Sequence, residues 1–293
     1  MSFCSRDFTF KKYKQLIETI KNSGYKTYTF KDYIKESKKR DLADTYIVIM
    51  RHDIDNKVDH PIALEMAKYE QSIGMPSTYY FRTIPDAFNK DLIAKISGMG
   101  HEIGYHYEVL NETQGDFSKA VELFKYNLEK MREICPIETI CQHGGSLGDL
   151  TASTFKGFLK TGIYLLLKKK KIKSFESKKI WEKYSFEDFG ILGETYLSLN
   201  FDKTIYFSDT GVSWDAFKKR VLDTIDTDYY SSQGRLIRTT NDLIELISSK
   251  KIYHINILTH PANWIDPLIP WIKWRILQVL RDFGKRKLLK NKK

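Results

Sequence analysis

The sequence predicts an α/β fold built around a parallel sheet. Short apolar runs typical of buried strands alternate with longer segments in which apolar residues recur at helical spacing. The chain has 293 residues, 42% of them hydrophobic, which is enough to bury one large core. No internal repeat or low-complexity linker interrupts the alternation. Repeated strand-helix units favour parallel strands, arranged as a barrel or as an open, doubly wound sheet.

The ends of the predicted helices carry residues with known positional preferences. The segment 60–73 has Pro61 in its first turn and Gly74 directly after its end. A Thr-Thr-Asn cap introduces the segment 240–249. On these signals we expect helices at 10–24, 60–73, 89–99, 116–134, 240–249 and 271–283, and strands at 46–50, 77–81, 102–105, 137–141, 204–207 and 253–258.

The formal net charge of +11 and the pI of about 9.2 raise the question of a nucleic-acid partner. The charge is concentrated in two segments, because residues 156–183 and residues 271–293 each carry +8. The rest of the chain sums to −5 and contains no recognisable nucleic-acid-binding motif. We therefore expect no nucleic-acid partner.

Cysteine content and hydropathy favour a cytoplasmic protein. The three cysteines, Cys4, Cys135 and Cys141, are too few for a disulfide framework and form no C-x-x-C pair. No apolar stretch approaches the roughly 20 residues that span a bilayer. The N-terminus has no apolar signal-peptide core.

Polar side chains end most of the predicted strands. In parallel α/β folds, active sites lie at the C-terminal ends of the strands. A single polar residue at a strand end usually belongs to a solvated turn or a helix cap. Polar residues at the ends of several strands together predict a functional site. In chain order these ends supply Asp53, Asp55, Arg82, His106, Glu108, His143, Asp209 and His260.

Carboxylate and imidazole together are the ligand set of a catalytic divalent metal such as Zn²⁺, which keeps one position open for water. Asp53 and Asp55 are two residues apart, so on an extended strand their side chains point the same way. One could then bind the metal while the other accepts a proton from water. Bound Zn²⁺ lowers the pKa of water from 15.7 to about 7.

The order of the motifs resembles the polysaccharide deacetylase superfamily of NodB homology, carbohydrate esterase family 4. More closely, it resembles an uncharacterised bacterial branch associated with surface-polysaccharide biosynthesis. The resemblance covers about residues 46–264 and rests on RHDID (51–55), STYYFR (77–82), GHEIGYHYE (100–108), CQHGG (141–145), DFGILGE (188–194), SDTG (208–211) and LTHP (258–261).

The resemblance implies an irregular (β/α)7 barrel, here with an N-terminal helix and a basic C-terminal helix. It implies Asp53 as general base, Asp55 and His106 as metal ligands, and His260 as the general acid that protonates the departing amine. The implied reaction is metal-dependent hydrolysis of an N-acetyl or other acyl group on a sugar. Zn²⁺ is the expected cofactor.

The sequence departs from the family pattern at the third metal ligand. Leu110 stands where the family has a histidine four residues after His106. His143, at the end of the next strand, is the candidate third ligand, and Glu108 is the alternative. A protein on the same barrel that has lost hydrolysis and only binds glycans is the alternative function.

Other strand-end residues are candidates for substrate binding. Arg82, Glu108 and Asp209 could bond a sugar, and Trp214 could pack on a pyranose ring. A plain core position is the other interpretation for Trp214. Packing of aromatic faces on sugar rings favours the first interpretation, and tryptophan's frequent burial favours the second.

The expected organisation has three parts. Residues 1–45 form an N-terminal helical extension packed on the body, residues 46–264 form the barrel with a basic insertion at about 150–180, and residues 265–293 form a basic amphipathic helix and tail. The segments 154–173 and 271–293 combine apolar residues with lysines, so they could contact an anionic membrane. The alternative is that the helix packs on the body while the lysines stay solvated.

Overall fold

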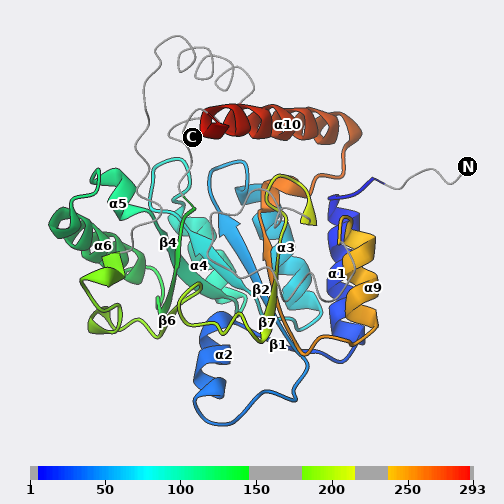
Figure 1. The fold of residues 1–293 in the computed structure, drawn as a ribbon, viewed down its shortest axis with the longest axis horizontal. Coiled ribbons are helices and arrows are strands. Elements are labelled where there is room, and N and C mark those ends of the chain that lie inside the picture. Colours follow the sequence, from blue (N-terminus) through cyan, green and yellow to red (C-terminus); the bar gives the residue numbers. More distant parts are fainter. Residues whose placement is uncertain (1–5, 145–179, 215–236, 291–293) are drawn as a thin grey trace, which may run out of the picture.

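The computed structural model describes residues 6–144, 180–214 and 237–290, with side chains described as far as Val279 in the last segment. Helices surround a central curled sheet, and the C-terminal helix crosses above the upper ends of the strands (Figure 1). The predicted basic insertion at about 150–180, the segment 154–173 and the residue Cys4 lie outside the described residues.

All strand pairs of the described sheet are parallel, which confirms the predicted α/β class. The strand order is β6-β5-β4-β3-β2-β8-β7, with β1 attached to β2. The strands from β2 to β8 follow a barrel order, and the described ladders leave one seam, between β6 and β7. The strands are β1 (Lys26–Tyr28), β2 (Ile47–Ile54), β3 (Thr78–Phe81), β4 (Glu102–Tyr107), β5 (Thr139–Gln142), β6 (Gly193–Glu194), β7 (Thr204–Ser208) and β8 (His254–Thr259).

Strand β2 extends further than its apolar run predicts. The run ends at Met50, but the strand continues to Ile54 because residues 51–54 pair with β3 and residues 47–52 pair with β8. All eight residues of β2 are buried. Arg51, His52 and Asp53 therefore lie inside the sheet and not in a turn after it.

The six predicted helices are present, and α2 and α5 are additional short helices. The last helix starts at Leu268, before the predicted start, since Pro270 is tolerated in a first turn where its missing N–H has no partner to lose. The helices are α1 (Phe10–Asn22), α2 (Phe30–Ser37), α3 (His60–Ser72), α4 (Lys90–Gly98), α5 (Val109–Glu112), α6 (Phe117–Arg132), α9 (Thr240–Ser248) and α10 (Leu268–Lys290).

The core is divided by the sheet. One cluster packs β3, β4 and β5 against α4 and α6, and another packs β2, β7 and β8 against α1 and α9. A third brings Phe30 and Ile34 of α2 onto Ile47 and Ile49, so α2 covers the N-terminal end of the sheet. The C-terminal strand ends are left on the opposite side, where the candidate site lies.

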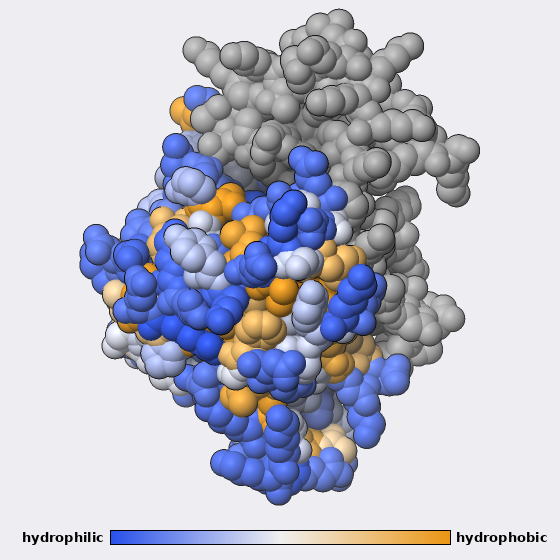
Figure 2. Space-filling model, turned by 90° about the vertical axis from the view of Figure 1, so that its left-hand side faces the viewer, coloured by the Kyte–Doolittle hydropathy of each residue, from blue (hydrophilic) through white to orange (hydrophobic). Residues whose placement is uncertain are grey.

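The outer surface on the side of α5 and α6 is a mixture of hydrophilic side chains and smaller apolar areas (Figure 2). Among the described residues, no helix combines the length and apolarity needed to cross a membrane.

Candidate metal centre

Alternation along β2 directs the two carboxylates to the inner face of the curled sheet. Ile47 and Ile49 belong to the cluster that packs under α2. Asp53 and Asp55 are separated from them by even numbers of residues, so along an extended strand their side chains point to the same face. The carboxylate of Asp53 is buried, whereas the side chain of Asp55 is 26% exposed. His52 has the opposite parity and points outward, where its Nε2 lies 2.9 Å from the buried carboxylate of Glu70.

Asp55, His106 and His143 converge at the ends of β2, β4 and β5. Oδ1 of Asp55 lies 3.5 Å from Nε2 of His106 and 3.6 Å from Nε2 of His143. The three ligand atoms all lie within 4.8 Å of one another. Two ligands at the usual 2.0–2.1 Å from a tetrahedral zinc ion are about 3.4 Å apart, so this spacing fits a metal triad.

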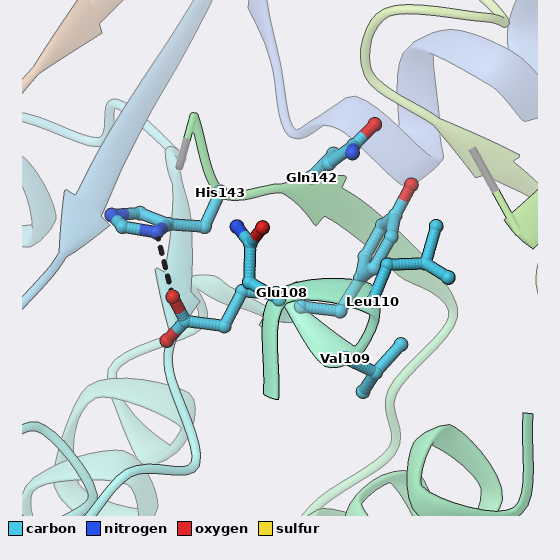
Figure 3. A pocket seen from close by; sticks show the side chains of 7 residues that line it. Glu108, Val109, Leu110, Gln142 and His143 are labelled. Carbon is cyan, nitrogen blue, oxygen red and sulfur yellow. Dashed lines mark hydrogen bonds and ion pairs between the residues drawn. The ribbon is translucent and has the colours of Figure 1, made fainter. Parts of the chain in front are cut away.

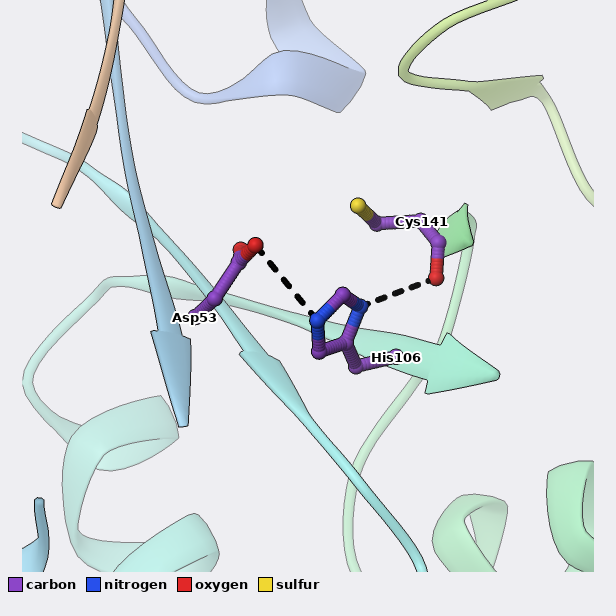
Figure 4. A group of neighbouring side chains, drawn as sticks. All are labelled: Asp53, His106 and Cys141. Atoms are coloured by element: carbon purple, nitrogen blue, oxygen red, sulfur yellow. Dashed lines mark hydrogen bonds and ion pairs between the residues drawn. The ribbon is translucent and has the colours of Figure 1, made fainter. Parts of the chain in front are cut away.

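Hydrogen bonds fix both imidazoles with Nε2 toward Asp55. Nδ1 of His106 donates to the backbone carbonyl of Cys141 at 3.0 Å, and Nδ1 of His143 donates to Glu108 at 3.1 Å (Figures 3 and 4). With the proton on Nδ1, the Nε2 lone pair is available to a metal. Burial lowers the pKa of His106 to about 4, so the ring is neutral at physiological pH, as a ligand must be.

Glu108 and Arg82 hydrogen-bond two members of the triad, His143 and Asp55. Nε of Arg82 donates to Glu108 at 2.8 Å, and its NH1 group donates to the backbone carbonyl of Asp55 at 3.0 Å. Burial raises the pKa of Glu108, but the hydrogen bond and charge of His143 and the charge of Arg82 outweigh it and lower that pKa to about 2. The structure thus places both residues where they orient His143 and Asp55, and their predicted contact with substrate stays a prediction.

Leu110 occupies a hydrophobic position beside the site. It belongs to the core cluster around α6 and also lines a small pocket with Glu108, Gln142 and His143 (Figure 3). The third member of the triad, His143, therefore comes directly after β5 and not from the position four residues after His106. Glu108, the alternative third ligand, instead bonds the imidazole of His143.

Two buried carboxylate oxygens support occupation by a cation. Oδ1 of Asp53 and Oδ1 of Asp55 have no hydrogen-bond donor among the described residues. Buried polar atoms are nearly always paired, so two unpaired carboxylate oxygens beside the imidazoles of His106 and His143 fit a metal ion. Oδ2 of Asp53 lies 3.4 Å from His106 Nε2 and 3.4 Å from the Arg51 guanidinium, which fixes its orientation.

A second possible ligand group combines Asp53 and His106 with Cys141 (Figure 4). Burial raises the pKa of the Cys141 thiol well above its ordinary value. Cys141 is fully buried, whereas the side chain of Asp55 is 26% exposed. The group containing Asp55 and His143 is the better candidate, because a catalytic metal needs a position open to water.

His260 forms a partly buried ion pair with Asp209 beside the triad. Its Nδ1 lies 2.6 Å from Oδ1 of Asp209, and its Nε2 lies 3.9 Å from Oδ2 of Asp55. Burial lowers the pKa of His260, but the charge and hydrogen bond of Asp209 dominate and raise it to about 10. The ring is therefore an imidazolium at neutral pH. Asp209 is fully buried behind it, and Trp264 Nε1 also donates to its Oδ2 at 2.8 Å, so Asp209 positions His260.

Asp59 lies beside the candidate site, although it was not among the residues predicted from the strand ends. Its carboxylate accepts the backbone N–H groups of Asp55 at 3.1 Å, Asn56 at 3.0 Å and Ala262 at 2.8 Å. It thereby joins the loop after β2 to the turn that follows His260. Its position directly before the predicted helix 60–73 could have identified it as a residue with a structural role, because Asp is common at helix N-caps.

Trp214 lies in the core, which is the other interpretation given to it from the sequence. It is 1% exposed, packs against Phe8 and Trp264, and its Nε1 donates to Thr240 at 3.1 Å. In this position the ring offers no face to a sugar.

Comparisons with known proteins leave the family open. No family model matches the chain, and no curated protein matches it. Among solved structures there is a weak likeness to the biosynthetic arginine decarboxylase SpeA from Campylobacter jejuni, with 14% identity and a TM-score of 0.26. The match covers 84% of this chain and 43% of that one, so the chain spans less than half of the decarboxylase. At this TM-score the likeness supports no conclusion about fold or function.

Proposed function

We propose that this chain is a metal-dependent hydrolase that removes an N-acetyl or other acyl group from a sugar in surface-polysaccharide (O-antigen or capsule) biosynthesis. The observation that carries the proposal is the triad of Asp55, His106 and His143, with Asp53 on one side and the charged His260 on the other. The motif resemblance to NodB-type deacetylases and a curled parallel sheet compatible with a (β/α)7 barrel support the choice of reaction.

In this proposal Asp55, His106 and His143 hold a divalent cation, with Zn²⁺ as the best fit to one carboxylate and two imidazoles. When bound, such a cation polarises an acyl carbonyl and lowers the pKa of water. The second oxygen of Asp55 and the exposed edge of His260 mark the side from which substrate approaches, since these two side chains are 26% and 21% exposed.

Asp53 is the proposed general base. Its Oδ1 has no donor among the described residues, so the oxygen is available to accept a proton from the attacking water. The other oxygen is held between His106 and Arg51. This arrangement fixes the carboxylate without occupying the oxygen that the reaction needs.

His260 is the proposed general acid. Its Nδ1–H is held by Asp209, and its Nε2–H faces the same space as Asp55. An imidazolium here can donate its Nε2 proton to the amine nitrogen that leaves when the amide bond breaks. A base and an acid on two sides of one carboxylate ligand is the pairing that amide hydrolysis requires.

The test is release of a primary amine by the zinc-loaded protein from N-acetylated sugar nucleotides and lipid-linked N-acetylated sugars. We expect turnover by the wild type and loss of turnover in Asp53→Asn with metal retained. The matched control is Asp86→Asn, because this surface aspartate lies in the loop after β3 and, in the described part of the chain, forms an ion pair with the exposed Lys57. Full metal loading and sugar binding without amine release would instead support the glycan-binding alternative.

A further inference from the structure

Helix α10 exposes an unusual share of large hydrophobic side chains. Eight large hydrophobic residues are exposed in the described part of the chain, and five of them lie on this helix. Scattered exposed apolar residues are normal, but a group on one element marks an interaction surface. The five are Leu268, Ile269, Ile272, Ile276 and Val279, with exposed fractions between 41% and 66%.

These five residues form one stripe. At 3.6 residues per turn they fall within about 100° of the helix circumference. The other side of the helix is fastened to the protein: Leu277 is buried, Trp271 Nε1 donates to the Asp7 carbonyl at 2.8 Å, and Trp274 Nε1 donates to Asn263 at 2.8 Å. The apolar stripe is therefore not needed to attach α10 to the body.

The attachment points of α10 lie next to the candidate site. Asn263, which receives Trp274, follows His260 by three residues, and Arg275 donates to the carbonyl of Val212 at 2.7 Å in the loop after Asp209. Figure 1 shows the helix crossing above the C-terminal strand ends. The stripe and the open side of the site are thus presented on the same end of the molecule.

The charge of α10 identifies the partner. Its sequence contains seven lysine and arginine residues and one acidic residue, Asp282. An apolar stripe on a strongly basic helix fits the interface of a membrane with anionic lipids, where apolar side chains enter the headgroup region and cations bind lipid phosphates. We propose that the outward face of α10 docks the protein on an anionic lipid surface.

The same charge argues against two other occupants. A second copy would bring two helices of equal positive charge together, which like-charge repulsion opposes. The segment 154–173 of this chain is also rich in lysine, so it too is electrostatically mismatched to α10. An anionic surface is the complementary partner for both segments.

This inference goes beyond the proposed hydrolysis and does not depend on it. Docking through α10 would hold the ends of β7 and β8, with Asp209 and His260, close to the lipid headgroups. A glycan attached to a membrane lipid could then reach the site without leaving the bilayer.

Vesicle co-sedimentation of the full-length chain tests the proposal. The probes are vesicles of phosphatidylcholine mixed with phosphatidylglycerol, and of phosphatidylcholine alone. The test variant is Ile272→Ser, Ile276→Ser and Val279→Ser together. The matched control is Tyr126→Ser with Leu197→Ser, which removes two exposed hydrophobic residues elsewhere.

We expect the wild type and the control variant to bind the anionic vesicles in preference to the neutral ones, and the triple variant to bind at least about tenfold more weakly. Equal binding by the triple variant, or no binding of the wild type to anionic vesicles, would overturn the proposal. A wild-type dimer that the triple substitution converts to a monomer, without vesicle binding, would assign the stripe to self-association. The wild type, the triple variant and the control variant should have equal metal content. Loss of vesicle binding at unchanged metal content would then concern α10 alone and not the proposed hydrolase site.

Discussion

Nδ1 of His260 lies 2.6 Å from Oδ1 of the buried Asp209 carboxylate, and the backbone N–H of His260 donates to both oxygens of the same group. Asp209 therefore fixes the ring, its tautomer and its charge together. The pKa of His260 is raised to about 10 mainly by this partner, against the opposing effect of burial. This pair makes a histidine on a strand end into a proton donor at neutral pH.

The substitution Asp209→Asn should remove the negative charge that keeps His260 protonated, while keeping the size of the side chain. We expect kcat to fall by about 10²-fold or more with little change in KM, because acid-base catalysis contributes in this range. The pKa of His260, followed by NMR on the imidazole, should fall toward its ordinary value. An unchanged His260 pKa in the variant would show that Asp209 does not control this group.

The ion pair of His260 and Asp209 predicts how the free energy of unfolding depends on pH. Because the folded pKa of His260 is about 10 and its ordinary value is 6.5, the stabilising effect is complete below pH 6.5 and is lost as the pH rises toward 10. Urea unfolding of metal-free wild type and His260→Gln should therefore show a stability difference that shrinks from about pH 6 to about pH 10. A difference that stays constant across this range would contradict the ion pair.

Asp59 should be essential to the geometry of the two loops. The substitution Asp59→Asn leaves one acceptor oxygen for three backbone donors, so we expect a loss of about 1–3 kcal/mol in the free energy of unfolding. Metal affinity, measured by competition with a chelator, should also fall because Asp55 loses its anchor. If affinity is unchanged while stability falls, Asp59 has only a structural role.

Glu70 is the centre of a buried network on the outer face of β2. Its carboxylate accepts hydrogen bonds from His52 at 2.9 Å, Tyr79 at 2.6 Å and Tyr13. Glu70→Ala leaves these groups buried without a partner and should cost about 3–5 kcal/mol, measured by urea unfolding.

The control for Glu70 is Glu65→Ala on the same helix, whose side chain is 57% exposed. It should change stability by less than about 0.5 kcal/mol. A similar small effect for Glu70→Ala would show that the network contributes little to stability.

Much of the fold and the membership of the site could be predicted from the sequence. Asp53, Asp55, His106, His143 and His260 come from the ends of four strands, β2, β4, β5 and β8, but the rule that parallel strands end at one edge is enough to bring them together. Period-two alternation also separates Asp53 from His52. These predictions use local patterns and one topological rule.

The supporting roles could not be predicted in the same way. Arg82, Glu108 and Asp209 are strand-end residues like the others, and only their distances show that they bond other site residues. The short strands β1 and β6 have too few residues to show a periodic pattern. Trp214 in the core and Asp59 between two loops depend on contacts between residues far apart in the chain.

The most direct test of the central claim is elemental analysis of metal content in the wild type, Asp55→Ala and His143→Ala. His60→Ala serves as the control, because this partly buried histidine bonds the Ala87 carbonyl away from the triad. We predict near one metal ion per chain in the wild type and control, and its loss in both triad variants. A wild type that holds no metal after incubation with zinc, cobalt and nickel would contradict the metal-dependent mechanism.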